Sequence, residues 1–132
     1  MSKDIVRKVL IVEDDSAIID VYKTVMEKSN LQAEVASSGS EAMRIVKEIA
    51  DGQQEAPDII LLDLILPDVN GMDILKEIRN NEKTKNIKVF IFSNQEPSSQ
   101  SSDLGAIKPD KFIIKSSIAP TELVKIINKE FE

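Results

Sequence analysis

Carboxylates follow two short apolar runs of this 132-residue chain. Residues 9–12 precede Glu13 and Asp14. Residues 59–62 precede Asp63 in the same way. If both runs are neighbouring strands of a parallel sheet, their carboxyl ends converge on one edge, which is where ligands bind in such sheets. Carboxylates held close together repel each other unless a cation neutralises them, and Mg²⁺ prefers oxygen ligands of this kind. The pattern predicts a Mg²⁺ site in which one carboxylate is a candidate for phosphoryl chemistry.

The composition excludes several classes of active site. The chain has no cysteine and no histidine, so a disulfide framework, a thiolate site, a Ser-His-Asp triad and imidazole acid–base catalysis are impossible. A net charge of -6 argues against direct binding to nucleic acid, which calls for a basic face. No apolar run approaches the roughly 20 residues that span a bilayer, and the first residues lack a signal peptide's pattern. We expect a cytoplasmic protein that contacts neither nucleic acid nor membrane directly.

Apolar runs alternate with stretches of helical periodicity along the whole chain, whose length suits one domain. We therefore expect residues 1–132 to form a single domain. Continuous apolar strands are typical of a sheet covered on both faces, and strict alternation predicts an α/β fold with a doubly wound parallel sheet and right-handed crossovers. The expected strands are residues 8–12, 32–36, 58–63, 89–92 and 112–114; the expected helices are residues 16–28, 40–50, 71–80 and a last helix that begins near Pro120.

Local signals predict where two of these helices begin and where the alternation is irregular. Asp15 or Ser16 can cap the helix of residues 16–28, and Ser40 can cap the next one. Between the fourth and fifth strands, residues 93–111 are rich in serine and contain two prolines and a glycine. These residues disfavour a long helix. We expect an irregular or short fourth helix around residues 100–104, with a plain surface loop as the alternative.

Residues at the ends of four expected strands resemble the receiver domain of two-component response regulators. The resemblance extends from residue 9 to residue 131 and includes the pattern D-x-x-x-P-x-x-x-G. It implies a single receiver domain, similar to the chemotaxis regulators, with a flavodoxin-like (βα)5 fold and a five-stranded parallel sheet of strand order 2-1-3-4-5. The residues that carry it are Glu13, Asp14, Asp63, Pro67, Gly71, Ser93 and Lys115.

The resemblance also implies a role for each carboxylate. Asp63 would be the phosphoacceptor, a nucleophile that forms an aspartyl phosphate. Asp14 would bind Mg²⁺ directly, and Glu13 would bind it through water. The backbone carbonyl of Ile65 would be a further metal ligand. Asp68 and Asp73 follow Asp63 in the next loop and helix. We interpret them as helix-start acids and not as metal ligands.

Three more residues receive roles from the resemblance. Ser93 would donate its hydroxyl to a phosphoryl oxygen. Lys115 would hold another phosphoryl oxygen and pair with the carboxylates, since a compact ammonium can balance the charge that builds on a transferred phosphoryl group. Phe112 matches an aromatic position whose rotamer reports phosphorylation in this family. A small shift of Ser93 toward a new phosphoryl group could bias a two-state loop.

Three positions depart from the family pattern. Ser116 stands where a proline usually follows the lysine of the fifth strand, which puts the geometry of that loop in question. Asn94 stands where a small residue usually follows Ser93. Its side chain could crowd the phosphoryl site or form a hydrogen bond there. Phe112 lacks the hydroxyl of the tyrosine that is common at its position, so a switch built on it would work by packing alone.

The leading functional hypothesis is a signalling switch. A histidine kinase or phosphotransfer protein would phosphorylate Asp63 with the help of Mg²⁺, and the chain would then bind a downstream protein partner. The chain would promote only its own phosphorylation and dephosphorylation, so we do not expect a true enzyme. The alternative is a pseudo-receiver, an interaction module that keeps the fold without the phosphate switch. An aspartate-dependent phosphohydrolase is disfavoured, because Ile65 occupies the position where those enzymes usually have a second acid.

Overall fold

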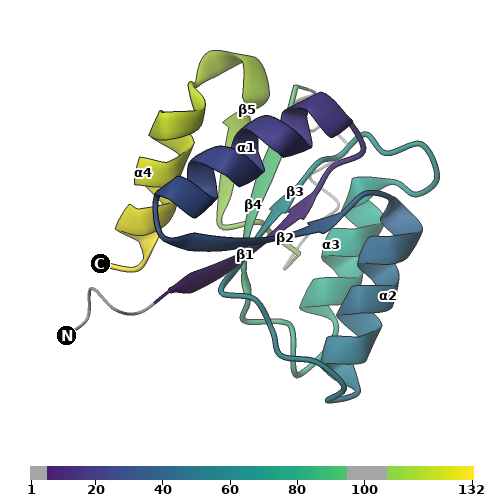
Figure 1. The fold of residues 1–132 in the computed structure, drawn as a ribbon. Coiled ribbons are helices and arrows are strands. Elements are labelled where there is room, and N and C mark those ends of the chain that lie inside the picture. Colours follow the sequence, from purple (N-terminus) through teal and green to yellow (C-terminus); the bar gives the residue numbers. More distant parts are fainter. Residues whose placement is uncertain (1–5, 95–106) are drawn as a thin grey trace.

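A computed structural model describes residues 6–94 and 107–132. These residues contain a five-stranded sheet with the strand order β2-β1-β3-β4-β5, and every neighbouring pair is parallel (Figure 1). The predicted fold class and strand order are confirmed. The irregular helix expected around residues 100–104 lies outside the described residues. The strands are β1 (Arg7–Val12), β2 (Leu31–Ala36), β3 (Ile59–Leu62), β4 (Lys88–Ser93) and β5 (Lys111–Ile114).

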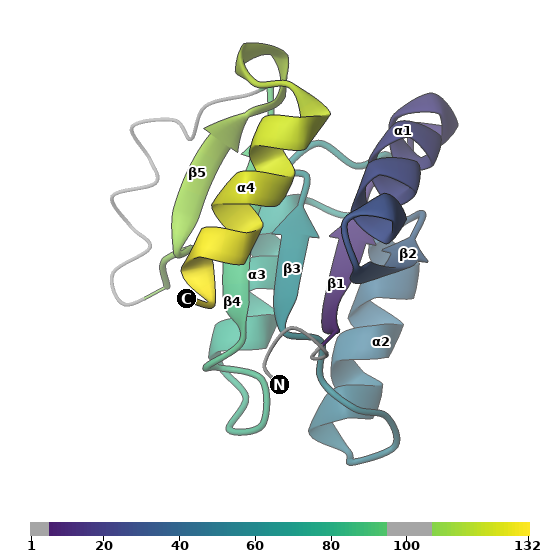
Figure 2. The same cartoon turned by 60° about the vertical axis from the view of Figure 1, so that its left-hand side comes forward.

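Helices cover both faces of the sheet. Figure 2 shows α1 (Ser16–Lys28) and α4 (Pro120–Glu130) in front of the sheet, and α2 (Gly39–Ala50) and α3 (Gly71–Arg79) behind it. Alternate residues of each strand point to opposite faces, so each face has its own apolar cluster. Burial on both faces explains why residues 9–12 of β1 and all of β3 are continuous apolar runs rather than alternating ones. No helix among the described residues is long and apolar enough to cross a membrane.

Two helix starts show how local chemistry places the elements. Asp15 caps α1 as predicted, because its Oδ1 accepts hydrogen bonds from the N–H groups of Ala17 and Ile18 at 2.9 and 3.1 Å. The predicted cap of α2 is wrong. Ser38, in an extended conformation, accepts the Glu41 N–H at 3.1 Å, and Ser40 lies inside the first turn. The cap therefore lies two residues earlier than predicted.

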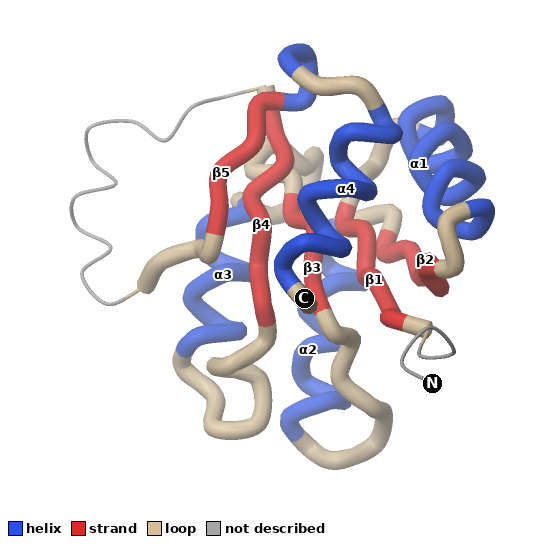
Figure 3. Tube along the Cα trace, turned by 90° about the vertical axis from the view of Figure 1, so that its left-hand side faces the viewer, coloured by secondary structure: helices blue, strands red, loops and turns tan. Residues whose placement is uncertain are grey.

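The strand register brings the functional candidates to one edge of the sheet. Val12 lies beside Leu62, and the Asp63 N–H donates to the Val12 carbonyl at 3.2 Å, so the residues after β1 and β3 are neighbours. Ser93 lies beside Ile114, the last residue of β5. Figure 3 shows the strands side by side with these carboxyl ends at the top. The convergence that the sequence suggested follows from the parallel arrangement.

Arg79 organises the opposite edge of the sheet, a role that the sequence analysis did not predict. Its guanidinium donates to the carbonyls of Lys85, Ile87 and Lys108 at 3.0, 2.7 and 3.0 Å. It also pairs with the Asp110 carboxylate at 3.0 Å. One side chain at the end of α3 therefore holds the segments that lead into β4 and β5. The planar five-donor group of arginine suits such a multiple contact, and lysine would not replace it.

Candidate functional site

Three carboxylates meet in a cleft of about 500 Å³ at the carboxyl edge of the sheet. Glu13 and Asp63 are 3% and 6% exposed, whereas Asp14 is open to solvent. One carboxylate oxygen from each of the three lies within 4.8 Å of the others. A compact set of carboxylate oxygens with an open side fits Mg²⁺, which binds through a few carboxylates and keeps several waters. Ile65, whose carbonyl was predicted as a further ligand, lines the same cleft.

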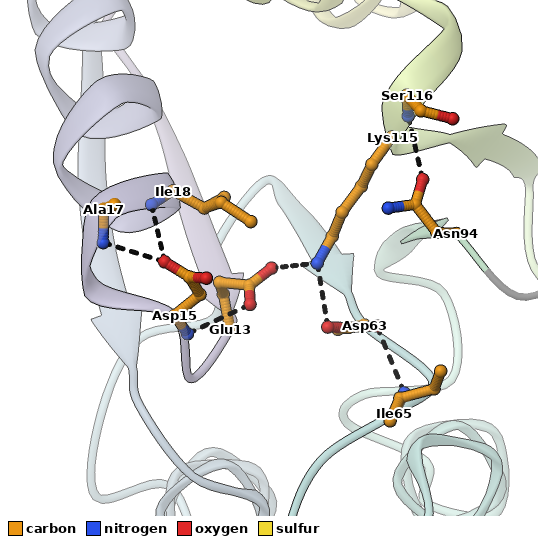
Figure 4. Close-up of polar contacts among 9 residues, drawn as sticks. All are labelled: Glu13, Asp15, Ala17, Ile18, Asp63, Ile65, Asn94, Lys115 and Ser116. Atoms are coloured by element: carbon orange, nitrogen blue, oxygen red, sulfur yellow. Dashed lines mark hydrogen bonds and ion pairs between the residues drawn. The ribbon is translucent and has the colours of Figure 1, made fainter.

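Lys115 joins the two buried carboxylates. Its Nζ lies 2.9 Å from Asp63 Oδ2 and also donates to Glu13 Oε1 (Figure 4). Burial alone would lower the pKa of this ammonium, but the hydrogen bonds to Glu13 and Asp63 outweigh burial and raise it. Burial raises the pKa of Glu13, and its hydrogen bond to Lys115 offsets only part of that rise. Three carboxylates share this cleft with the Lys115 ammonium, and such an acidic set favours a divalent cation.

The loop after β3 is folded tightly around Asp63. The Ile65 N–H donates to Asp63 Oδ1 at 3.1 Å, and the Gly71 N–H donates to the Leu64 carbonyl at 3.1 Å. A Cβ at position 71 would lie 2.4 Å from the Asp63 carbonyl oxygen and 2.6 Å from the Leu64 Cα. These neighbours are backbone atoms that cannot rotate away. The glycine of the D-x-x-x-P-x-x-x-G pattern is therefore required by the close approach of α3 to the residue that carries the candidate nucleophile.

Gly71→Ala should lower the free energy of unfolding by about 3 kcal/mol, the upper end of overpacking costs, because the added methyl meets backbone. It should also weaken Mg²⁺ binding, because relief of the clash displaces the Asp63 backbone. Gly52→Ala is the matched control. Its φ of +78° strains an alanine, but the nearest atom to a Cβ there is the Lys83 Nζ at 3.7 Å. Urea unfolding and Mg²⁺ titration should show stability loss in both variants and weaker Mg²⁺ binding only in Gly71→Ala.

Asp68 ties the same loop to α2. Its two carboxylate oxygens accept the N–H groups of Gly39 and Ser40 at 2.9 Å each. These N–H groups belong to the first turn of a helix, where they have no partner within the helix. Asp68 is thus a helix-start acid, as predicted, but of α2 rather than of the helix that follows it; Asn70 caps α3. The hydrogen bonds from Ser40 and Gly39 lower the pKa of the Asp68 carboxyl.

Asp68→Asn should reduce stability at neutral pH and should do so less in acid. A carboxyl whose pKa is lowered by folding contributes stability above its ordinary value of 3.8, and this contribution is lost as pH falls through the lower folded-state pKa. Urea unfolding of the wild type and the variant at about pH 6 and about pH 3 should therefore give a difference that shrinks in acid. An equal difference at both pH values would mean that the Asp68 charge does not contribute.

Ser93 and Lys115 lie in the cleft as predicted, whereas Phe112 is not among the residues that line it. Ser93 is completely buried as the last residue of β4, and both Ser93 and Lys115 line the cleft. Phe112 packs, partly buried, against the apolar cluster on the α2–α3 face. Its proposed rotamer switch stays a prediction.

Asn94 and Ser116, which follow Ser93 and Lys115 and depart from the family pattern, contact each other. The Ser116 N–H donates to Asn94 Oδ1 at 2.8 Å (Figure 4). Ser116 belongs to a short 3₁₀ turn, η3 (Lys115–Ser117), and the peptide bond that precedes it is trans. The loop after β5 is therefore held by a side chain from the end of β4. Sequence reasoning named both residues as departures from the family pattern, but it did not predict that they would meet.

An aromatic pair supports the cleft from the α1 side. The centres of the Phe92 and Tyr22 rings are 5.0 Å apart, and the two rings pack edge to face. The Lys115 Nζ lies 5.9 Å from the centre of the Phe92 ring. Burial raises the pKa of the Tyr22 hydroxyl. Tyr22 and Phe92 are both buried, and they belong to the cluster packed under α1 and α4. This packing links the interior of the domain to the residue before Ser93.

The fold is similar to solved structures of receiver domains. A CheY-like response regulator receiver domain protein from Methanospirillum hungatei JF-1 superposes with a TM-score of 0.80 at 23% identity, covering 96% of this chain and 94% of that one. The receiver domain of the sensor histidine kinase PA1611 from Pseudomonas aeruginosa PAO1 gives a TM-score of 0.77 at 18% identity, with 95% and 97% coverage. That structure has a magnesium ion coordinated in its active site cleft.

Sequence comparison assigns the family. The transcriptional regulatory protein TrcR of Mycobacterium tuberculosis is 35% identical over 75 residues, which are 57% of this chain but only 27% of TrcR. The chain thus matches less than a third of that relative's length. The family model of the response regulator receiver domain matches residues 9–128, nearly the whole chain. The chain belongs to the receiver domain family of two-component response regulators.

Proposed function

We propose that this receiver domain is a phosphorylation-dependent signalling switch that accepts a phosphoryl group on Asp63. The observation that carries the proposal is the Lys115 ammonium held between Asp63 and Glu13 in the acidic cleft. A buried carboxylate in contact with a fixed ammonium, with further carboxylates within 4.8 Å, suits phosphoryl transfer, which depends on positioning and charge neutralisation. A carboxylate with a merely structural role would not need an excess of negative charge around it.

The reaction proposed is transfer from a phosphohistidine of a histidine kinase or phosphotransfer protein. An oxygen of the Asp63 carboxylate attacks phosphorus, a new O–P bond forms, and the imidazole leaves with the electron pair of the broken P–N bond and takes up a proton. The Lys115 ammonium stabilises the charge on one phosphoryl oxygen, and the Ser93 hydroxyl donates to another. When bound, Mg²⁺ would supply further positive charge at these oxygens.

The metal would be held by this chain's own oxygens. Asp14 and Asp63 would bind Mg²⁺ directly, Glu13 would bind it through water, and the Ile65 carbonyl would complete the protein ligands. The presence of Glu13, Asp14 and Asp63 around one point supports this assignment. The rise in the pKa of Glu13 caused by burial also supports it, because a divalent cation would offset the unfavourable charge there.

The output proposed is binding, not turnover of a substrate. Ser93 ends β4, and Lys115 begins the η3 turn that leads to α4. A displacement of either residue toward the phosphoryl group would alter the surface formed by β4, β5 and α4, and a downstream protein partner would recognise that change. We propose a cytoplasmic setting, as expected for a partner of histidine kinases, and no enzymatic activity beyond the domain's own phosphorylation and dephosphorylation.

Incubation with Mg²⁺ and acetyl phosphate, followed by intact mass measurement, tests the proposal. We expect a single phosphate adduct that requires Mg²⁺ and that is removed by hydroxylamine, as an acyl phosphate should be. The competing function is a pseudo-receiver, which Asn94 would favour if its side chain only crowded the cleft where the family usually has a small residue. A wild-type protein that stays unmodified under these conditions, while it binds Mg²⁺, would favour the pseudo-receiver.

A further inference from the structure

The orientation of the Asn94 side chain is determined by its neighbour. A backbone N–H can only donate, so the atom of Asn94 that lies 2.8 Å from the Ser116 nitrogen must be the carbonyl oxygen. The NH₂ group of the same amide is then directed away from Ser116. Figure 4 shows this nitrogen on the side of the amide that faces Lys115 and Asp63. Asn94 also lines the cleft that contains those two residues.

The chemistry of the cleft gives this NH₂ group a use. A phosphoryl group on Asp63 would bring oxygens that need hydrogen-bond donors, and side-chain amides are suitable donors at sites of developing negative charge. A freely rotating asparagine could present its carbonyl instead, which would repel a phosphoryl oxygen. The Ser116 N–H removes that alternative, because turning the amide over would bring two donors together. The donor is thus preorganised before any phosphoryl group arrives.

We propose that Asn94 is a phosphoryl-binding residue of this chain: the Ser116 N–H fixes its carbonyl oxygen so that its NH₂ group donates to an oxygen of the phosphoryl group on Asp63. The inference rests on the proposed role of Asp63 as phosphoacceptor. It assigns a function to Asn94 and Ser116, two of the three residues that depart from the family pattern. The same hydrogen bond holds the backbone of Ser116, the residue that follows Lys115.

Beryllofluoride, which mimics a phosphoryl group on a carboxylate, distinguishes this role from simple crowding. Asn94→Ala should bind beryllofluoride roughly 10–100-fold more weakly in saturating Mg²⁺, the expected loss for one hydrogen bond to a charged group. Its affinity for Mg²⁺ alone should be unchanged. If Asn94 only crowded the cleft, its removal would leave beryllofluoride affinity unchanged or increase it. Donation and crowding therefore predict different results, and an unchanged or increased beryllofluoride affinity would overturn the assignment.

Two further variants separate the donor from the acceptor. Asn94→Asp keeps an oxygen for the Ser116 N–H but replaces the NH₂ group with a charged oxygen, so beryllofluoride should bind even more weakly than to Asn94→Ala. Ser116→Ala keeps the backbone N–H and should match the wild type. If Asn94→Asp bound beryllofluoride as well as the wild type does, the NH₂ group would not be the donor and the assignment would be wrong.

Nuclear magnetic resonance gives a direct readout of the proposed bond. The side-chain NH₂ signals of Asn94, identified by their absence in Asn94→Ala, should shift and exchange more slowly with solvent when beryllofluoride is added to the Mg²⁺-bound wild type. Unmoved signals with bound beryllofluoride would overturn the role of Asn94 and leave that of Asp63 intact. A wild type that does not bind beryllofluoride at all would overturn both.

Discussion

Asp63→Asn should abolish the phosphate adduct that acetyl phosphate and Mg²⁺ produce on the wild-type protein. The amide has nearly the same shape as the carboxylate but is not a nucleophile toward phosphorus. The variant should still fold, because it conserves volume, and Lys115 keeps its hydrogen bond to Glu13. Loss of one direct carboxylate ligand should also weaken Mg²⁺ binding, by at least the roughly 10–100-fold that loss of an outer-shell partner causes. Intact mass, urea unfolding and Mg²⁺ titration measure the three effects.

The matched control for this variant is Asp73→Asn. Asp73 is an exposed acid in the first turn of α3, so it shares the chemistry of Asp63 without its position in the cleft. We expect Asp73→Asn to be phosphorylated like the wild type. A full adduct on Asp63→Asn would place the phosphoryl group on another residue and would contradict the central role of Asp63.

Lys115→Met should lower the free energy of unfolding in metal-free buffer by about 3–5 kcal/mol, because it leaves two buried carboxylates without their cation. The side chains of Lys115, Glu13 and Asp63 are only 11%, 4% and 7% exposed, so solvent screens the loss little. Mg²⁺ should restore stability more strongly than in the wild type, since the ammonium no longer competes for the same oxygens. Phosphorylation should nevertheless be impaired. Urea unfolding across a Mg²⁺ series measures the first two effects.

The pH dependence and a control variant identify the cause of the Lys115→Met effect. A lysine whose pKa is raised by folding contributes stability that is fully present below its ordinary value of 10.5 and is lost only as pH rises through the higher folded-state value. The loss in Lys115→Met should therefore be equal at about pH 7 and about pH 9. Lys125→Met, which removes an exposed lysine of α4, should change stability little. Mg²⁺ binding weakened by Lys115→Met would contradict the competition argument.

The main part of the fold was predictable because burial leaves a clear pattern in the sequence. β1 and β3 are inner strands of a sheet covered on both faces, so residues 9–12 and 59–62 are all apolar and the carboxylates that follow them stand out. Glu13, Asp63 and Lys115 each come directly after a strand. Parallel order then places all three at one edge, and no knowledge of side-chain packing is needed for that step.

Contacts between loops were not predictable in the same way. Asp68 was interpreted as a helix-start acid, but the helix that it contacts is α2, because the free N–H groups of Gly39 and Ser40 lie near it in space and not in sequence. The bond from Ser116 to Asn94 and the contacts of Arg79 likewise join segments far apart in the chain. A polar residue in a loop has many possible partners, and only the folded backbone selects one.

The aromatic pair beneath the cleft gives the protein an intrinsic optical probe. Tyr22 is the only tyrosine, and the chain has no tryptophan, so ultraviolet-excited emission comes almost entirely from one side chain. That ring touches Phe92, the residue before Ser93, and its phenol senses the charges of Lys115 and Glu13. Binding of a cation or a phosphoryl mimic should therefore change the fluorescence of the unlabelled, unmodified chain, because the Tyr22 ring packs against Phe92, the residue that precedes Ser93.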